Sequence, residues 1–140
     1  ETGFEAGVDY KGADFRGFFA TTGKDVYETP WGFGRIIKTE EIISGLVPEQ
    51  KAYAASIGYD FGKLGIEGLY AKVFYGVFDN AGNESDAQEV EYQVRYDFGK
   101  KFKSLEGLNL DVIYTNMYSK DASDITRLHV RVKYAFALLN

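Results

Sequence analysis

The chain has 140 residues, a formal net charge of -5 at pH 7 and a sequence pI near 4.9. This acidic balance argues against nucleic acid as a partner, because nucleic-acid-binding domains carry a basic patch or stripe. The absence of cysteine excludes disulfide scaffolds, thiolate zinc sites and cysteine nucleophiles. No stretch approaches the roughly 18 consecutive apolar residues that a membrane-spanning helix needs.

The composition favours β-sheet structure in which one face of the sheet contacts water. The sequence holds 11 Tyr, 11 Phe and 16 Gly but only 2 Pro, a balance typical of strands and turns. The mean hydropathy of -0.27 is low for a membrane protein. A transmembrane β-barrel accounts for it, because alternate residues of each strand face water.

Apolar and polar residues alternate with a period of two along most of the chain, which indicates half-buried strands. The clearest example runs from Glu89 to Phe98, where Val90, Tyr92 and Val94 alternate with charged or amide side chains. In chain order, the predicted strands cover about residues 4–11, 13–22, 50–61, 67–79, 87–99, 107–118 and 125–138.

The connections between these strands alternate between short and long. The longest covers residues 23–49, whereas the connections at 62–65 and 99–105 are compact turns. Short turns on one rim and longer loops on the other are typical of outer-membrane barrels. We therefore expect an all-β, transmembrane, antiparallel up-and-down barrel with about seven strands, and residues 23–49 as a long external loop.

A hairpin pattern occurs twice. The sequence YDFGK at residues 59–63, followed by EGL at 67–69, returns as YDFGK at 96–100, followed by EGL at 106–108. Both copies place an outward Tyr and Phe at a strand end, and Tyr134 and Phe136 end the last strand in the same way. These aromatic residues predict one interfacial girdle on the short-turn side of the membrane.

An odd number of strands leaves an unpaired sheet edge in the hydrocarbon, which bacterial barrels avoid by closing with an even number. We therefore expect upstream strands of the same barrel, supplied by the native protein or by a partner chain.

The segments GYDFGKLGIEGL, EVEYQVRYDF, LEGLNLDVIY and DITRLHVRVKYAFAL resemble the C-terminal end of OprD-type outer-membrane porins. The resemblance is good over residues 50–139 and looser before that. It implies a monomeric barrel of eighteen strands that passes small solutes, often carboxylates, by facilitated diffusion. It also implies that the loop at 23–49 folds inward to narrow the pore. Asn140 departs from the terminal aromatic residue common in outer-membrane proteins.

Basic residues share the polar face of the last predicted strand. Arg127, Arg131 and Lys133 stack along the barrel axis at spacings of roughly 7 to 13 Å. Arg95 and Lys72 extend this row, which we call the basic ladder and which resembles the family's ladder. Guanidinium groups grip carboxylates bidentately, so the ladder predicts a path for anionic solutes.

Carboxylates are also predicted to face the lumen. An alternative to solute binding is therefore open, in which the ladder cations only neutralise these carboxylates. The carboxylates are Glu89, Glu91, Asp97 and Asp111. His129 is the lone histidine, and the cations around it favour a pore-lining position over a catalytic one.

The long loop holds the only Trp. Trp31, Phe33 and Arg35 lie in a glycine-flanked turn, which fits either a pore constriction or an anchor in the headgroup zone. The apolar residues from Ile36 to Val47 recur at rough helical spacing and predict a short helix packed in the lumen.

These observations predict a porin of the bacterial outer membrane, not an enzyme, that gives passive, facilitated diffusion of small, anionic solutes. Its expected partners are the lipid bilayer with its lipopolysaccharide, small solutes and the upstream strands, without cofactor, metal or nucleic acid. Two alternatives stay open, an outer-membrane barrel enzyme and a soluble lipid-binding barrel. An enzyme requires an acid/base cluster near His129, and a lipid carrier requires its apolar face inside.

Overall fold

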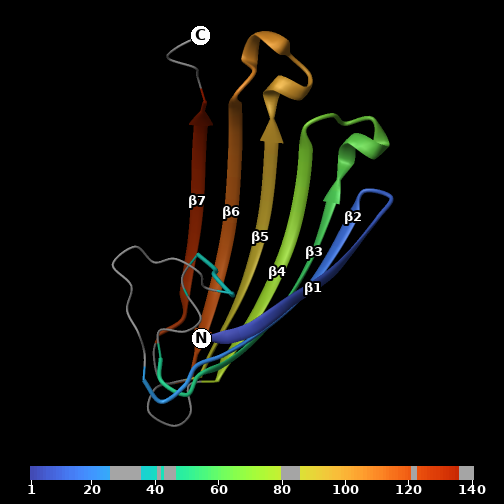
Figure 1. Cartoon of the computed structure of the whole chain (residues 1–140). Helices are drawn as coiled ribbons and strands as arrows, with labels where there is room; N and C mark the ends of the chain where they lie inside the picture. Colours follow the sequence, from blue (N-terminus) through green and yellow to red (C-terminus); the bar gives the residue numbers. More distant parts are fainter. Residues whose placement is uncertain (26–35, 41, 43–46, 80–85, 121–122, 136–140) are drawn as a thin grey trace.

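A computed structural model of the chain describes residues 1–25, 36–40, 42, 47–79, 86–120 and 123–135. Over these residues, seven strands form one antiparallel sheet, in which each strand pairs with its neighbours in sequence (Figure 1). The strands are β1 (Thr2–Tyr10), β2 (Ala13–Thr21), β3 (Lys51–Asp60), β4 (Leu69–Asp79), β5 (Ala87–Asp97), β6 (Leu108–Ser119) and β7 (Ile125–Tyr134). Short 3-10 helices follow β3 and β5: η1 (Phe61–Leu64), η2 (Phe98–Lys100) and η3 (Lys103–Leu105). None of the helices in the described ranges is long and apolar enough to span a membrane.

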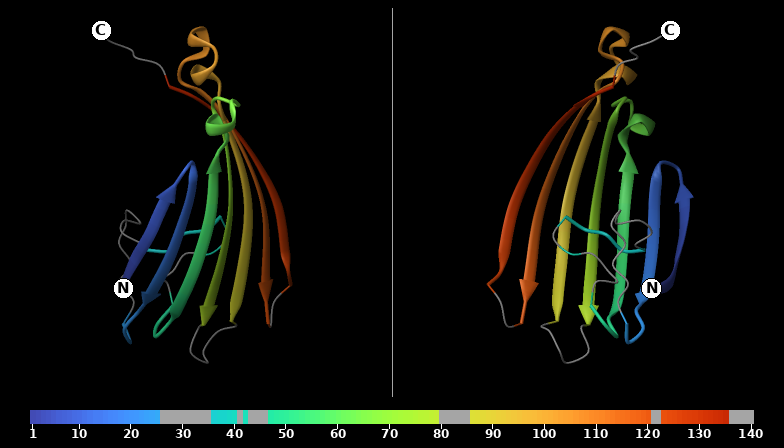
Figure 2. Two further views of the ribbon diagram at one scale, coloured as in Figure 1. Left: turned by 90° about the vertical axis from the view of Figure 1, so that its right-hand side faces the viewer. Right: turned by 60° about the vertical axis from the view of Figure 1, so that its left-hand side comes forward.

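The sheet is curved like one side of a barrel (Figure 2). Its two faces differ in chemistry. One row of residues in register crosses all seven strands on the convex face. In order from β1 to β7, the row is Val8, Phe15, Ile57, Val73, Tyr92, Tyr114 and Leu128. These apolar side chains remain between 38% and 64% exposed, so the convex face is an uncovered apolar surface.

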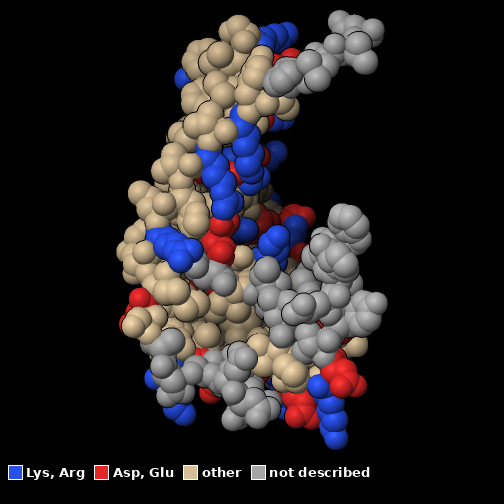
Figure 3. All heavy atoms as spheres, turned by 90° about the vertical axis from the view of Figure 1, so that its left-hand side faces the viewer, with Lys and Arg blue, Asp and Glu red and all other residues tan. Residues whose placement is uncertain are grey.

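The neighbouring row, one residue along each strand, faces the hollow of the sheet. From β2 to β7 it consists of Arg16, Ser56, Phe74, Glu91, Thr115 and Arg127. Figure 3 shows Lys, Arg, Asp and Glu side chains gathered in this hollow, with uncharged residues along the outer edge. The period of two in the sequence therefore separates an apolar convex face from a charged concave face.

The turns of the two copies of the repeated hairpin begin in the same way. Asp60 accepts a hydrogen bond from the Gly62 N–H at 2.8 Å, and Asp97 accepts one from the Gly99 N–H at 3.0 Å. These caps start η1 and η2, so the chain leaves the sheet a residue or two earlier than the predicted strands 50–61 and 87–99.

Aromatic pairs lie at equivalent positions of the two hairpin sequences. Tyr59 packs on Phe61 and Tyr96 packs on Phe98, each with the ring planes 80° apart. Tyr134 ends β7 at the same rim, and Phe136 lies outside the described residues.

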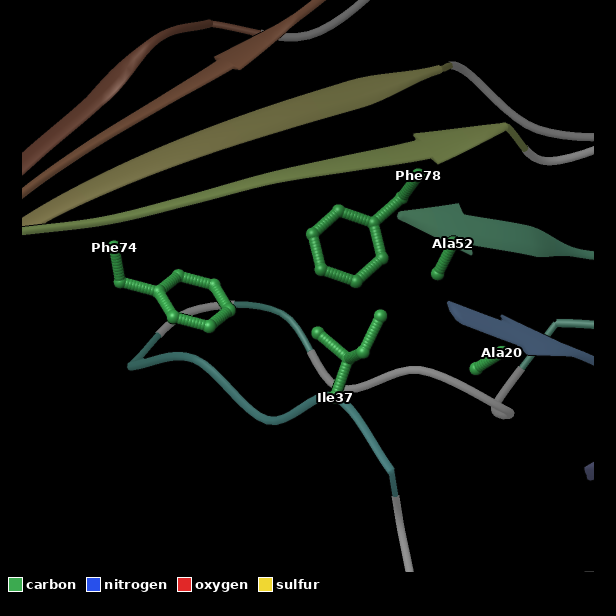
Figure 4. Close-up of a cluster of buried hydrophobic side chains, with 5 residues drawn as sticks. All are labelled: Ala20, Ile37, Ala52, Phe74 and Phe78. Atoms are coloured by element: carbon green, nitrogen blue, oxygen red, sulfur yellow. The ribbon is translucent and has the colours of Figure 1, made fainter. Parts of the chain in front are cut away.

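Part of the long 23–49 connection lies against the concave face (Figure 4). Ile37, only 1% exposed, contacts a cluster formed by Ala20, Ala52, Phe74 and Phe78 from β2, β3 and β4. This cluster explains why two phenylalanines of β4 lie on the concave face.

The prediction of a short helix over residues 36–47 is wrong for the part described. Residues 36–40 form no helix, and the Thr39 N–H donates a hydrogen bond to the Ile42 carbonyl at 2.9 Å. Rough helical spacing of apolar residues did not distinguish a helix from a non-helical segment that buries Ile37 against the sheet.

Candidate pore wall and its docked segment

The described residues 36–40 and 42 are held on the concave face by carboxylates of β5. We call these residues the docked segment. The Ile42 N–H donates to Glu89 at 3.1 Å, and the Thr39 hydroxyl lies within hydrogen-bond distance of the same carboxylate. The Glu40 N–H donates to Glu91. Two acids of the sheet thus satisfy backbone donors of a segment about 50 positions away in sequence.

This docking explains the burial of the two acids. Glu89 is 0% and Glu91 is 8% exposed, which is rare for carboxylates unless their oxygens are hydrogen-bonded. The sequence pattern leaves both acids as candidates to neutralise the basic ladder. The hydrogen bonds just described go to the docked segment.

A second centre on the concave face is Asp111 of β6, whose side chain is 3% exposed. Both of its oxygens accept from Arg95, Oδ1 from Nε at 3.0 Å and Oδ2 from Nη2 at 3.1 Å. Gln93 donates to Oδ1 at 2.9 Å, and the Lys133 ammonium lies 3.4 Å from Oδ2. Asp111 therefore joins β5 and β7 across β6 and neutralises part of the ladder.

Arg131 of β7 pairs with the docked segment. Its Nη1 donates to Glu40 Oε1 at 2.9 Å, and its Nη2 contacts Oε2, so the guanidinium and carboxylate meet as two forks. Asp111 lies directly opposite Arg131 in the β6–β7 register. The Arg131 side chain is still 40% exposed, against 17% for Glu40.

The other two ladder residues, Arg127 and Lys72, lie on the same face, as does His129. Arg127 lies opposite Thr115, and His129 lies opposite Ile113 in the β6–β7 register. The Lys72 ammonium lies 6.0 Å from the centre of the Phe74 ring.

Lys72 and Arg95 line an open cavity of about 830 Å³ at the short-turn end of the sheet. Asp97 and Lys100 line the same cavity. The five ladder residues thus belong to one continuous concave surface. Trp31, Phe33 and Arg35, predicted to form a constriction, lie outside the described residues.

The structure also brings together polar residues that no motif in the sequence marks. Arg16 Nη2 lies 2.6 Å from Asp9 Oδ1, and Tyr70 donates to Asp14 at 2.9 Å. Glu40 is the most important omission. Its only signal in the sequence is its place in the short polar stretch at residues 38–41, between the apolar pairs at 36–37 and 42–43.

Within the described ranges, no group of three or more His, Cys, Asp or Glu residues is arranged to hold a metal ion.

No protein-family model and no curated protein sequence matches this chain. Solved structures do. Pseudomonas aeruginosa OccK5 (OpdH) matches with a TM-score of 0.72 and 21% identity over 93% of this chain and 37% of that one. Pseudomonas aeruginosa OccK9 (OpdG) matches with a TM-score of 0.71 and 20% identity over 93% of this chain and 35% of that one.

Acinetobacter baumannii OccAB4 matches with a TM-score of 0.70 and 27% identity, over 94% of this chain and 35% of that one. All three neighbours are OprD-family porins. This chain spans little more than a third of the length of each. Its fold is therefore that of a seven-strand section of an OprD-type outer-membrane porin barrel.

Proposed function

We propose that this chain forms part of the wall of a bacterial outer-membrane porin that lets small solutes, carboxylates among them, cross by passive diffusion. The observation that carries the proposal is the two-faced sheet. Its convex face exposes an apolar row across every strand, which suits lipid, and its concave face is charged, which suits water.

The same observation argues against a soluble lipid carrier. Such a barrel places apolar side chains around its cavity and charges on its outside. Here the charged face lies on the inside of the curve. The porin neighbours also support a channel rather than an enzyme, and His129 stands beside cations instead of an acid/base pair.

The proposed preference for anions rests on the excess of basic over acidic side chains on β6 and β7. Strand β7 carries Arg127, Arg131 and Lys133 on its concave face and no acid, and Asp111 is the sole acid of β6. Because Asp111 is shared between Arg95 and Lys133, positive charge exceeds negative charge on this part of the concave face. A passing anion gains about 1 to 4 kcal/mol from one charge several Å away, at effective dielectrics between those of water and protein.

The docked segment is proposed to narrow the channel. It occupies part of the hollow and is held by an apolar anchor, Ile37, and by the acids of β5. We infer that it reduces the cross-section of the channel in the complete barrel. In this proposal the barrel lies in the outer membrane among lipopolysaccharide and phospholipid, and upstream strands complete the wall.

The test is ion selectivity of the complete barrel in a planar bilayer. With a KCl gradient at low salt, the reversal potential should show anion preference, and Arg127→Gln should move it toward cation preference. Lys120→Gln, beyond the end of β6, removes the same charge and should have much less effect. Both shifts should shrink as salt rises, because the Debye length falls from about 30 Å at 0.01 M to about 3 Å at 1 M.

A barrel without conductance would contradict the channel proposal. A conducting barrel whose selectivity is the same in Arg127→Gln and the native protein would contradict the anion preference alone.

A further inference from the structure

The Arg131–Glu40 pair has the geometry by which proteins recognise a free carboxylate. Both nitrogens of the Arg131 fork face both oxygens of the Glu40 carboxylate, and the side chains come from elements 91 positions apart in sequence. Planar, bidentate pairing of this kind is specific for carboxylate and phosphate groups. Glu40 therefore occupies the place that the carboxylate of a solute would take.

Arg131 is available for such a ligand because its cross-strand neighbour is already engaged. Asp111 lies opposite it in register, yet both Asp111 oxygens accept from Arg95, and Gln93 and Lys133 also contact them. The Arg131 fork extends instead toward the docked segment, with its side chain still 40% exposed.

Glu40 can release Arg131 without undocking its segment. Ile37 remains buried in the apolar cluster, and the Ile42 N–H remains bonded to Glu89. The backbone of Glu40 itself is held through its N–H by Glu91. Only the side chain of Glu40 has to rotate for the fork to become free.

We propose that Arg131 is a carboxylate-binding site that the chain itself fills with Glu40 when no solute is present. Glu40 is thus an internal competitor, and a solute carboxylate exchanges with it. The apparent affinity for the solute equals the intrinsic affinity of the free fork multiplied by the fraction of time for which the fork is free. Such weakening suits a channel, in which a solute must bind well enough to enter and loosely enough to leave. The inference rests on the proposed function only in requiring that solutes reach the concave face.

The experiment measures equilibrium binding, so it does not depend on conductance. The probes are 4-fluorobenzoate and its neutral analogue 4-fluorobenzamide, observed by fluorine NMR with the complete barrel in detergent micelles. Native protein should bind the carboxylate better than the amide. Glu40→Gln should tighten 4-fluorobenzoate binding by about two- to fivefold, the equivalent of an ion pair worth up to about 1 kcal/mol.

The control for Glu40→Gln is Glu49→Gln, which makes the same charge change at an exposed position of the same connection and should leave binding unchanged. Arg131→Gln should abolish the preference for the carboxylate over the amide. Arg131→Lys keeps the charge but loses the fork, and should retain only part of the preference.

Equal affinities of Glu40→Gln and native protein for 4-fluorobenzoate would overturn the inference, as would an equal gain in Glu49→Gln. A preference that survives Arg131→Gln would overturn it too. Because binding is read without current, a barrel that fails to conduct but shows the Glu40 effect would contradict the channel proposal and leave this one standing.

Discussion

At the scale of single residues, two glycines show how the repeated hairpin specifies its own geometry. Gly68 has a φ of 86° and Gly107 a φ of 85°, in the left-handed region that side chains disfavour. A Cβ at Gly68 would lie 2.2 Å from the Asp97 carbonyl oxygen, and one at Gly107 equally close to that of Ala135. Each glycine carbonyl also accepts a hydrogen bond from the same neighbouring residue. The EGL motif is therefore conformationally required in both copies.

Gly107→Ala should destabilise the barrel by more than about 1 kcal/mol, because the left-handed backbone alone costs about 1 to 2 kcal/mol and the clash with Ala135 adds to it. Urea titration of the complete barrel in liposomes measures the effect. Gly23→Ala, where nothing lies within 4 Å of the added Cβ, is the control and should be close to neutral. Equal losses in the two variants would show that Gly107 is not constrained as described.

Adjacent positions of β5 should respond oppositely to a charge. Val94 is 46% exposed on the apolar convex face, whereas Gln93 donates to Asp111 on the concave face. Val94→Arg should cost about 2 to 4 kcal/mol near the bilayer midplane. Gln93→Arg keeps a donor beside the Asp111 carboxylate and should be tolerated. If the same urea titrations show Gln93→Arg to be the more damaging, the two faces are assigned the wrong way round.

At the scale of elements, the docked segment depends on contacts that the strands provide and local sequence does not specify. Its anchor, Ile37, fits a cluster drawn from three strands, and its polar bonds reach β5 and β7. The acids of β5 are buried because the segment covers them. The segment and the concave face therefore form one packed unit.

Ile37→Ala should loosen this unit, because removing a large buried aliphatic side chain costs about 2 to 5 kcal/mol. Single-channel recording should then show a higher or noisier conductance than in the native barrel. Lys38→Ala, at an exposed position of the same segment, should leave the current unchanged. A native-like current in Ile37→Ala would mean that the segment does not restrict the channel.

At the scale of the whole molecule, the sheet was predictable from sequence and the docked segment was not. Period-two alternation predicted the strands and their faces because each strand needs only its own residues to separate an apolar from a polar side. The repeat predicted two equivalent turns. By contrast, the Arg131–Glu40 pair joins residues 91 positions apart, and nothing near Glu40 in the sequence distinguishes a docked non-helical segment from a helix. Such a pair depends on the tertiary fold, which brings β7 and the docked segment together.

The most direct test of the central claim, that the concave face lines a water-filled pore and the convex face meets lipid, is thiol accessibility. Single cysteines would replace Lys72, Gln93, Val73 and Val94 in a cysteine-free complete barrel in a bilayer, followed by treatment with a membrane-impermeant, anionic thiol reagent. The account predicts rapid reaction and a changed current at positions 72 and 93, and no reaction at 73 and 94. Rapid reaction at 73 and 94 with protection at 72 and 93 would contradict it.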